Sequence, residues 1–241
     1  MVTSGADAAQ EQELKISSGN SELDARLGGG IAEGALTVIE GPPSSGKSVV
    51  CQQLTYGSLR SGVNVAYYTS ESNVKPLLDQ MSSINLNVTD YFLMDFLRIY
   101  RMQVSGRGEN SVVLFDRLAD HIDALPKEYK VIIVDSVTRI VTHGQEVGIM
   151  DFFSACKDLC EGGRIIFLVV HTYAFGEGML ARVRSICDAH LSFRLEEMRE
   201  LVIKVMEVTK VRNADRQDST MSFDVEPGVG LKTIPMSRAR A

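Results

Sequence analysis

The chain has 241 residues, enough for one large α/β domain with a sizeable core, and its 44% hydrophobic content is ordinary for a soluble globular protein. The formal net charge of −6 gives no overall attraction to nucleic acid, although it leaves room for a local basic patch. The longest strongly apolar run, Ile165 to Val170, is far too short to span a bilayer. We therefore expect any association with a membrane to go through a partner.

The chain begins with a polar, acidic stretch over residues 1–14, which predicts a flexible tail without a signal-peptide pattern. A short helix is predicted over residues 21–27, with Ser21 as its N-cap, and the glycines at 28–30 end it. The cysteines lack zinc-type spacing, which favours apolar packing in a reduced, cytoplasmic setting. They are Cys51, Cys156, Cys160 and Cys187.

Residues 41–48, Gly-Pro-Pro-Ser-Ser-Gly-Lys-Ser, match the phosphate-binding pattern G-x-x-x-x-G-K-[ST]. A β-branched strand is predicted before them over residues 36–40 and a helix after them over 49–60, which is the context that this loop needs. Backbone N–H groups and the helix N-terminus would cradle phosphates, Lys47 would reach the β- and γ-phosphates, and Ser48 would bind Mg²⁺. The expected nucleotide-binding residues of the loop are Gly41, Ser44, Ser45, Gly46, Lys47, Ser48 and Val49.

Strand and helix patterns then alternate through residue 171, which predicts an α/β fold with a doubly wound, mostly parallel sheet. Strands are expected over 63–68, 131–134 and 165–170, and helices up to about 82, over 112–125, 147–160 and 179–187. Residues 83–110 are less clear. We expect a short strand pair or an apolar connector over 91–102 and a loop over 105–109. Alternating residues over 191–195, 201–209 and 220–225 predict antiparallel strands at one edge of the sheet.

Two carboxylates follow predicted strands, at the sheet edge where such folds bind ligands. Asp135 ends the apolar run at 131–134, which is the Walker B pattern, and would hold the hydration shell of Mg²⁺. Glu71 follows the strand after the P-loop helix and would orient the water that attacks the phosphate. The alternative for Glu71 is an ordinary acidic residue at a helix start.

Further polar residues end later strands. His171 and Thr172 follow the strand at 165–170 and would sense the γ-phosphate, although a hydrogen-bonded structural histidine is the alternative. Lys210 and Arg212 flank one residue on a strand and therefore point to the same side. They would reach a phosphate in this subunit or in a neighbour, or else remain solvated charges.

The opening run at residues 16–31, the P-loop at 41–48, and Val-Asp-Ser-Val-Thr at 134–138 together resemble RecA/KaiC-type ATPase domains. The run His-Thr-Tyr-Ala-Phe at 171–175, the single-domain length and Lys210-x-Arg212 make the chain similar to the FlaH (ArlH) family, which are ATP-binding proteins of the archaeal flagellum, or archaellum, motor.

The resemblance implies a RecA/KaiC-like ATP-binding domain over residues 15–235 and a C-terminal tail over 236–241. It also implies ATP and Mg²⁺ as cofactors and a ring, a hexamer, in which Lys210 and Arg212 reach the γ-phosphate bound by a neighbour. The ring would dock on the motor ATPase FlaI beneath the membrane protein FlaJ, at the cytoplasmic side of the motor.

One feature departs from the family pattern. KaiC-type domains usually carry two adjacent glutamates after the second strand, whereas this chain has Ser70 and Glu71. The resemblance therefore implies weak hydrolysis. Two alternatives stay open, a RecA/RadA-like DNA-dependent ATPase and a single-domain KaiC-like signalling ATPase or autokinase, for which Ser136, Thr138 and Thr172 supply hydroxyls.

Overall fold

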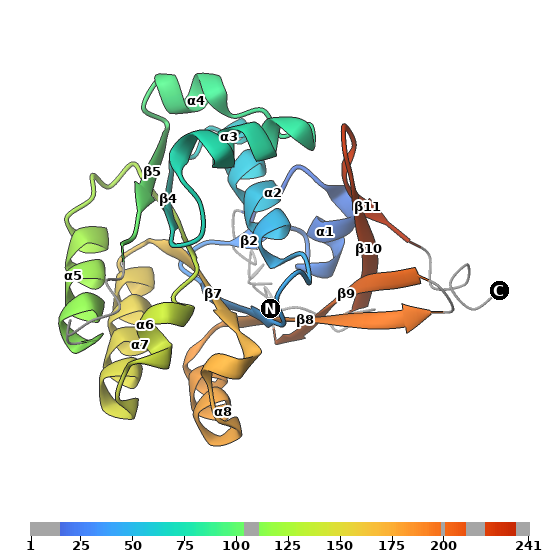
Figure 1. Ribbon diagram of the computed structural model, residues 1–241. Helices are drawn as coiled ribbons and strands as arrows, with labels where there is room; N and C mark the ends of the chain where they lie inside the picture. Colours follow the sequence, from blue (N-terminus) through green and yellow to red (C-terminus); the bar gives the residue numbers. More distant parts are fainter. Residues whose placement is uncertain (1–14, 104–110, 199–200, 211–219, 235–241) are drawn as a thin grey trace, which may run out of the picture.

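The computed structural model describes residues 15–103, 111–198, 201–210 and 220–234. In these residues a nine-stranded sheet runs through the molecule in the order β11-β10-β9-β8-β3-β7-β6-β4-β5, with helices on both faces (Figure 1). Its strands are β3 (Leu36–Gly41), β4 (Val65–Thr69), β5 (Leu97–Arg101), β6 (Val131–Asp135), β7 (Ile165–His171), β8 (Ala189–Met198), β9 (Leu201–Lys210), β10 (Thr220–Glu226) and β11 (Gly230–Thr233).

The sheet has a parallel part and an antiparallel part. Strands β8, β3, β7, β6, β4 and β5 are neighbours in parallel pairs, whereas β9, β10 and β11 continue from β8 as antiparallel hairpins. A small antiparallel pair, β1 (Lys15–Ile16) and β2 (Ile31–Ala32), precedes the sheet. This arrangement confirms the predicted fold class, a doubly wound, mostly parallel sheet with antiparallel edge strands.

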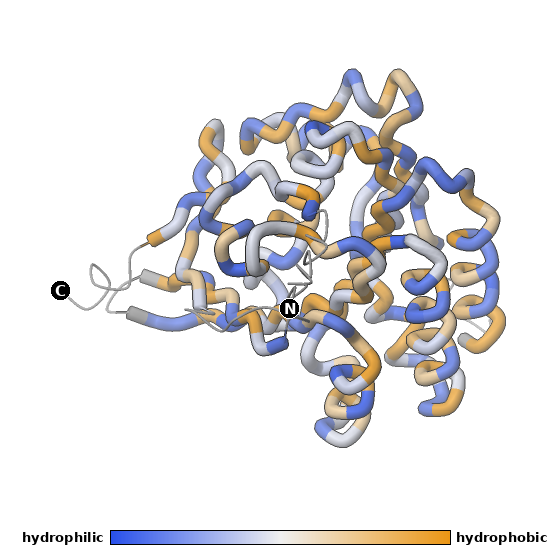
Figure 2. The backbone as a smooth tube through the Cα atoms, turned by 180° about the vertical axis from the view of Figure 1, so that it is seen from behind, coloured by the Kyte–Doolittle hydropathy of each residue, from blue (hydrophilic) through white to orange (hydrophobic). Residues whose placement is uncertain are grey.

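Helices cover both faces because the parallel strands are apolar on both sides. They are α1 (Ser21–Arg26), α2 (Lys47–Arg60), α3 (Val74–Ser83), α4 (Thr89–Leu93), α5 (Ser111–Asp123), α6 (Thr138–Thr142), α7 (Glu146–Glu161) and α8 (Glu177–Ile186), with a 3₁₀ turn η1 (Thr172–Ala174). In β6, Val131 and Ile133 belong to the core cluster under α1, α2 and α3, while Ile132 and Val134 belong to the cluster under α5, α6, α7 and α8. The helices that cover the sheet carry both hydrophobic and hydrophilic residues along each turn, as expected for helices with one buried and one exposed face (Figure 2).

Three local predictions were wrong or incomplete. The N-cap of α1 is Asn20 and not Ser21, because the Asn20 side chain accepts a hydrogen bond from the Leu23 N–H at 3.0 Å. Residues 91–102 form no strand pair. They form the end of α4 and the single strand β5, which pairs in parallel with β4. Helix α6 was not predicted, because it is too short to show a helical period.

Some predictions fall outside the described residues, namely the tails over 1–14 and 236–241 and the loop over 105–109. Within the described part of the chain, no helix has the length and apolar character that crossing a membrane requires. The cysteines at 51, 156, 160 and 187 are buried and unpaired, as apolar packing predicts.

Helix α2 packs directly on the segment that precedes α1, and Gly57 is the point of closest approach. A Cβ atom at Gly57 would lie 2.0 Å from the carbonyl carbon of Ser18 and 2.2 Å from its oxygen. One turn earlier, the Gln53 side-chain amide donates to the same carbonyl at 2.8 Å. The backbone of the opening segment therefore lies in a groove that only glycine leaves open.

Gly57→Ala should destabilise the fold by about 2 kcal/mol or more, although alanine is the better helix former, because the added methyl group overlaps backbone atoms that cannot rotate away. The matched control is Gly178→Ala in α8, where an added Cβ atom would have nothing within 4 Å of it. The control should gain about 0.5–1 kcal/mol. Urea unfolding measures both changes, and a Gly57→Ala protein as stable as the parent would contradict this packing.

Candidate functional site

The predicted P-loop joins β3 to α2 at the carboxyl end of the parallel strands. Strand β3 ends at Gly41, helix α2 begins at Lys47, and Gly46 caps the helix with a left-handed φ of 95°. A Cβ atom at Gly46 would meet the Phe223 ring at 2.7 Å, so both the backbone conformation and the space demand glycine here. Helix α2 therefore presents its free N–H groups at the mouth of the loop.

The Lys47 side chain folds back over the loop and is only 4% exposed. Its ammonium donates to the Pro42 carbonyl at 2.6 Å and lies 3.5 Å from the Ser45 hydroxyl, which itself donates to the same carbonyl at 2.8 Å. Burial lowers the pKa of Lys47, while the charges of Asp135 and Glu71 act in the opposite direction. The carbonyl of Pro42 thus holds the cation of Lys47.

Asp135 lies beside the loop, as the Walker B pattern predicts, and is 5% exposed. Its Oδ2 atom accepts a hydrogen bond from the Tyr67 hydroxyl at 2.8 Å, and the Ser48 hydroxyl lies close enough to this carboxylate to lower its pKa. Burial raises the pKa of Asp135, and the bonds from Tyr67 and Ser48 oppose that rise. Ser48 and Asp135 therefore lie together, as the sequence predicts for a cation site, whereas the role of Tyr67 was not predicted.

These oxygen atoms suit Mg²⁺ more than a transition metal. Among the described residues, no group of three or more His, Cys, Asp or Glu side chains could hold a metal ion. Mg²⁺ is usually bound by one or two carboxylates together with waters and the phosphates of a substrate. The pair Ser48 and Asp135 fits that mode, in which the nucleotide supplies the remaining ligands.

Glu71 lies just beyond the end of β4 and is exposed. The Ser136 hydroxyl donates to Glu71 Oε1 at 3.4 Å, and the backbone N–H of Glu71 donates to the Thr69 hydroxyl at 3.2 Å. Ser70 links the same two strands, because its hydroxyl donates to the Ser136 carbonyl at 3.1 Å. The serine that replaces a second carboxylate is therefore a hydrogen-bonding link between the ends of β4 and β6.

His171 is brought to the same edge, because it ends β7 directly opposite Gly41 of β3. Its Nδ1 atom lies 3.0 Å from the Thr138 hydroxyl, which also accepts the backbone N–H of His171 at 3.0 Å. The ring stacks on Tyr173 with 5.3 Å between the centroids. Burial and then the charge of Lys47 lower the pKa of His171, so the ring is neutral at pH 7.

Lys210 is bound to the C-terminal end of α8. Its ammonium donates to the carbonyl oxygens of Arg184 at 3.1 Å and Ser185 at 3.3 Å, and also to that of Cys187. These carbonyls lie at the C-terminus of α8, where a cation is favourable. The Lys210 ammonium is thus hydrogen-bonded within its own subunit rather than merely solvated. Arg212 lies outside the described residues.

A polar cluster that no sequence pattern indicated lies directly behind the P-loop, with Glu40 and His190 buried at its centre. Glu40, the residue before Gly41, makes an ion pair with Arg184 of α8, and its Oε2 atom lies 3.4 Å from Nε2 of His190. The other ring nitrogen of His190 bonds to the Thr209 hydroxyl. Burial alone would raise the pKa of Glu40, but the bonds and charges of His190 and Arg184 outweigh it and lower that pKa.

The cluster connects the P-loop strand to distant parts of the chain. Arg184, in the last turn of α8, pairs through its side chain with Glu40 of β3, and its carbonyl accepts from Lys210 of β9, so β3, α8 and β9 are held at one point. No sequence pattern marks these residues, because Glu40 and Arg184 are 144 positions apart. The one local signal for this cluster is Glu40 itself, a charged residue near the end of the mostly apolar strand β3.

The hydroxyls considered for an autokinase differ in access. Ser136 and Thr138 are buried and hydrogen-bonded, whereas Thr172 is exposed at the start of η1. Burial argues against phosphorylation at the first two, and Thr172 is the hydroxyl left to test.

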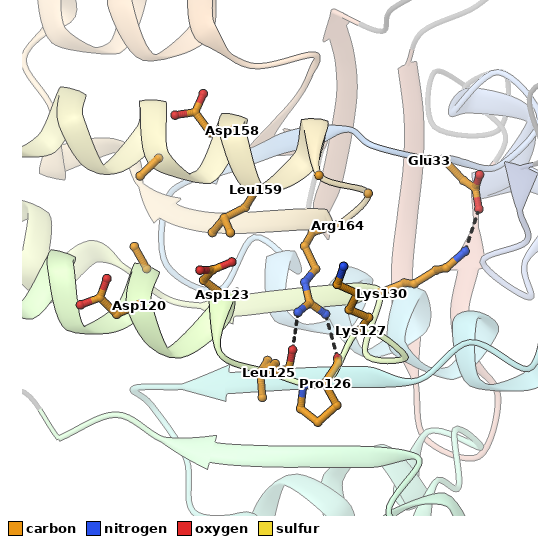
Figure 3. Close-up of a pocket in the computed structure, with 14 residues that line it drawn as sticks. Glu33, Asp120, Asp123, Leu125, Pro126, Lys127, Lys130, Asp158, Leu159 and Arg164 are labelled. Atoms are coloured by element: carbon orange, nitrogen blue, oxygen red, sulfur yellow. Dashed lines mark hydrogen bonds and ion pairs between the residues drawn. The ribbon is translucent and has the colours of Figure 1, made fainter.

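A cavity of about 870 Å³ lies at the opposite edge of the sheet, beside α5 and the C-terminal end of α7 (Figure 3). Three aspartates line it, namely Asp120, Asp123 and Asp158. Its buried arginine, Arg164, already donates to the carbonyls of Pro126 at 3.0 Å and Tyr129 at 2.7 Å. Lys127 and Lys130 also line the cavity, so its charges are mixed. It lies at the amino ends of β6 and β7, whereas folds of this kind bind ligands at the carboxyl ends of the strands.

Comparisons with known proteins agree with this geometry. The model of the KaiC family of ATPases matches residues 16–238. The archaeal flagellar ATP-binding protein FlaH of Sulfolobus acidocaldarius is 31% identical over 229 residues, which are 94% of this chain and 99% of that protein.

Two solved structures share the fold. The flagellar accessory protein FlaH of Methanocaldococcus jannaschii has a TM-score of 0.80 at 24% identity, over 92% of this chain and 98% of its own. A KaiC-like protein of Pyrococcus horikoshii has a TM-score of 0.74 at 16% identity, over 92% and 99% of the two chains. The predicted RecA/KaiC-type fold and the resemblance to FlaH are thereby confirmed.

Proposed function

Because the chain belongs to the KaiC family of ATPases and, within it, to the FlaH proteins, we propose that it is an ATP-binding regulatory component of the archaellum motor. The observation that carries ATP binding is the joint placement of Lys47, Ser48 and Asp135 around the N-terminus of α2. We assign ATP and Mg²⁺ to a single RecA/KaiC-like domain over residues 15–235.

Each residue has a defined part in this proposal. The N–H groups at the start of α2 and the Lys47 ammonium bind the β- and γ-phosphates, for which Lys47 exchanges the Pro42 carbonyl. Ser48 and Asp135 hold Mg²⁺ and its waters. The neutral ring of His171, opposite Gly41, contacts the γ-phosphate side of the loop and passes its presence through Thr138 to α6.

Hydrolysis is slow in this proposal, because one carboxylate, Glu71, is available to orient water and Ser70 takes the place of a second. ATP then acts mainly as a switch, whose binding changes the affinity of the protein for its partners. We assign a hexameric ring that docks on the motor ATPase FlaI beneath the membrane protein FlaJ, at the cytoplasmic side of the motor.

Lys47→Ala should weaken ATP binding about ten- to a hundred-fold, because a charge-assisted hydrogen bond contributes roughly 1.5–3 kcal/mol. Lys127→Ala, which removes an exposed lysine from the cavity at the opposite edge, is the matched control and should leave binding unchanged. Isothermal titration calorimetry with Mg·ATP measures both. If a folded Lys47→Ala protein bound ATP with the same affinity as the parent, the assignment of ATP to this site would be wrong.

Turnover should stay well below the enzyme median of about 10 s⁻¹. Glu71→Gln should suppress the slow hydrolysis while ATP stays bound, since the amide keeps the shape of the side chain but is a poor base. A phosphate-release assay beside the binding measurement separates the two effects. Turnover that is fast, or that Glu71→Gln leaves unchanged, would argue against the switch and against the role of Glu71.

Assembly should depend on the γ-phosphate through Lys210. To reach a neighbouring subunit, the Lys210 ammonium must leave the carbonyls at the end of α8. The negative γ-phosphate of ATP would attract the ammonium to the neighbour, and ADP lacks that phosphate. Light scattering should therefore detect larger assemblies in ATP than in ADP, and Lys210→Ala/Arg212→Ala should lose that difference while still binding ATP. If the double variant assembles in ATP as the parent does, Lys210 acts only within its own subunit.

A further inference from the structure

A second hollow lies at the carboxyl end of β4 and β5, on the face of the sheet covered by α5 and α6 rather than by the P-loop helix. Its volume is about 300 Å³, and Ile140 of α6 closes one side. Three rings form what we call the aromatic corner, which consists of Tyr68, Tyr100 and His121. The hollow is separate from every residue assigned to ATP above.

The strand register builds the aromatic corner. Tyr68 of β4 and Tyr100 of β5 are partners in a parallel pair, so their side chains project from the same face. The two rings stack with centroids 4.9 Å apart and 26° between their planes. The ring of His121 of α5 is nearly perpendicular to both, at 90° to Tyr68 and 79° to Tyr100, and its Nδ1 atom lies 2.6 Å from the Tyr68 hydroxyl.

The rim of the hollow is cationic. Arg101 of β5 and Arg117 of α5 both line it and both are exposed. Among the described residues neither guanidinium has a hydrogen bond or an ion pair, and no described Asp or Glu lines the hollow. Most other arginines at the sheet have partners, as Arg98 has in Asp95 at 2.7 Å. Within the part of the chain that the structure describes, the hollow therefore combines aromatic rings with two guanidinium groups that have no carboxylate partner.

This combination has a recognisable ligand chemistry. Nucleobases stack on aromatic side chains, and guanidinium groups bind phosphate oxygens in pairs of hydrogen bonds. We propose that the aromatic corner binds a nucleobase that carries a phosphate, with the ring against Tyr100 and His121 and the phosphate on Arg101 and Arg117. The source of that ligand is a free mononucleotide or one nucleotide of a single strand.

A ligand there would be coupled to the P-loop site through β4 and α6. Tyr67 and Tyr68 are adjacent on β4 and point to opposite faces, and Tyr67 bonds to Asp135 at 2.8 Å. Ile140 belongs to α6, whose first residue, Thr138, bonds to His171. Occupancy of the aromatic corner would therefore shift the residues that surround the γ-phosphate.

The test is photolabelling of the full chain with 8-azido-AMP, followed by mapping of the labelled peptides. Label is expected on the segments that contain Tyr100 or His121, with competition by unlabelled AMP. Because Lys47→Ala weakens binding at the P-loop alone, label at the aromatic corner should persist in that variant. Failure of ATP to bind at the P-loop is thus distinguished from failure of this proposal.

Arg117→Ala should raise the half-saturating concentration at the aromatic corner about tenfold, and Tyr100→Ala should raise it by at least as much. Arg60→Ala is the matched control, because Arg60 is also an exposed arginine beside a tyrosine, Tyr56, but lies on α2 at the other face. Arg60→Ala should leave the half-saturating concentration at the aromatic corner unchanged.

Competition identifies the source of the ligand. A short single-stranded oligonucleotide that displaces the label at a concentration about tenfold below AMP assigns the aromatic corner to nucleic acid, and the reverse order assigns it to free nucleotides. No label at the aromatic corner, no competition by AMP, or label that Arg117→Ala and Tyr100→Ala leave unchanged would each overturn the proposal.

Discussion

The structure depends on a buried positive charge. The Lys47 ammonium is withdrawn from water, and such a charge is strongly unfavourable unless polar groups replace its hydration. The Pro42 carbonyl supplies a direct bond, and the carboxylates of Asp135 and Glu71 supply negative potential from the ends of β6 and β4. The parallel order of the sheet is what brings those strand ends together around the loop.

The parts of the site that lie within a short stretch of sequence could be predicted. The P-loop and Asp135 each follow an apolar strand, and the glycine-rich pattern and the strand-ending carboxylate are local signals. The alternation of strands and helices likewise predicted the parallel sheet. Residues 91–102 were misjudged, because a short helix and a half-buried edge strand there have neither a clear helical period nor a clear alternation.

The rest of the site depends on contacts between distant residues, which no local pattern encodes. Tyr67 bonds to Asp135 across 68 positions, and Glu40 meets Arg184 across 144. The bonds of Lys210 to the end of α8 were not predicted either, because they follow from the pairing of β9 with β8, which places Lys210 opposite His190. Such contacts become visible only when the order of the strands is known.

The two outer strands of the sheet have a further consequence. β5 carries Arg98 and Arg101 along its free edge, and β11 has only four residues, with Lys232 paired to Glu226 at 2.7 Å. Short edges that carry charge are poor templates for another strand. Strand pairing between copies of this chain is therefore disfavoured at both edges, which protects the protein at high local concentration against growing into a continuous cross-molecular sheet.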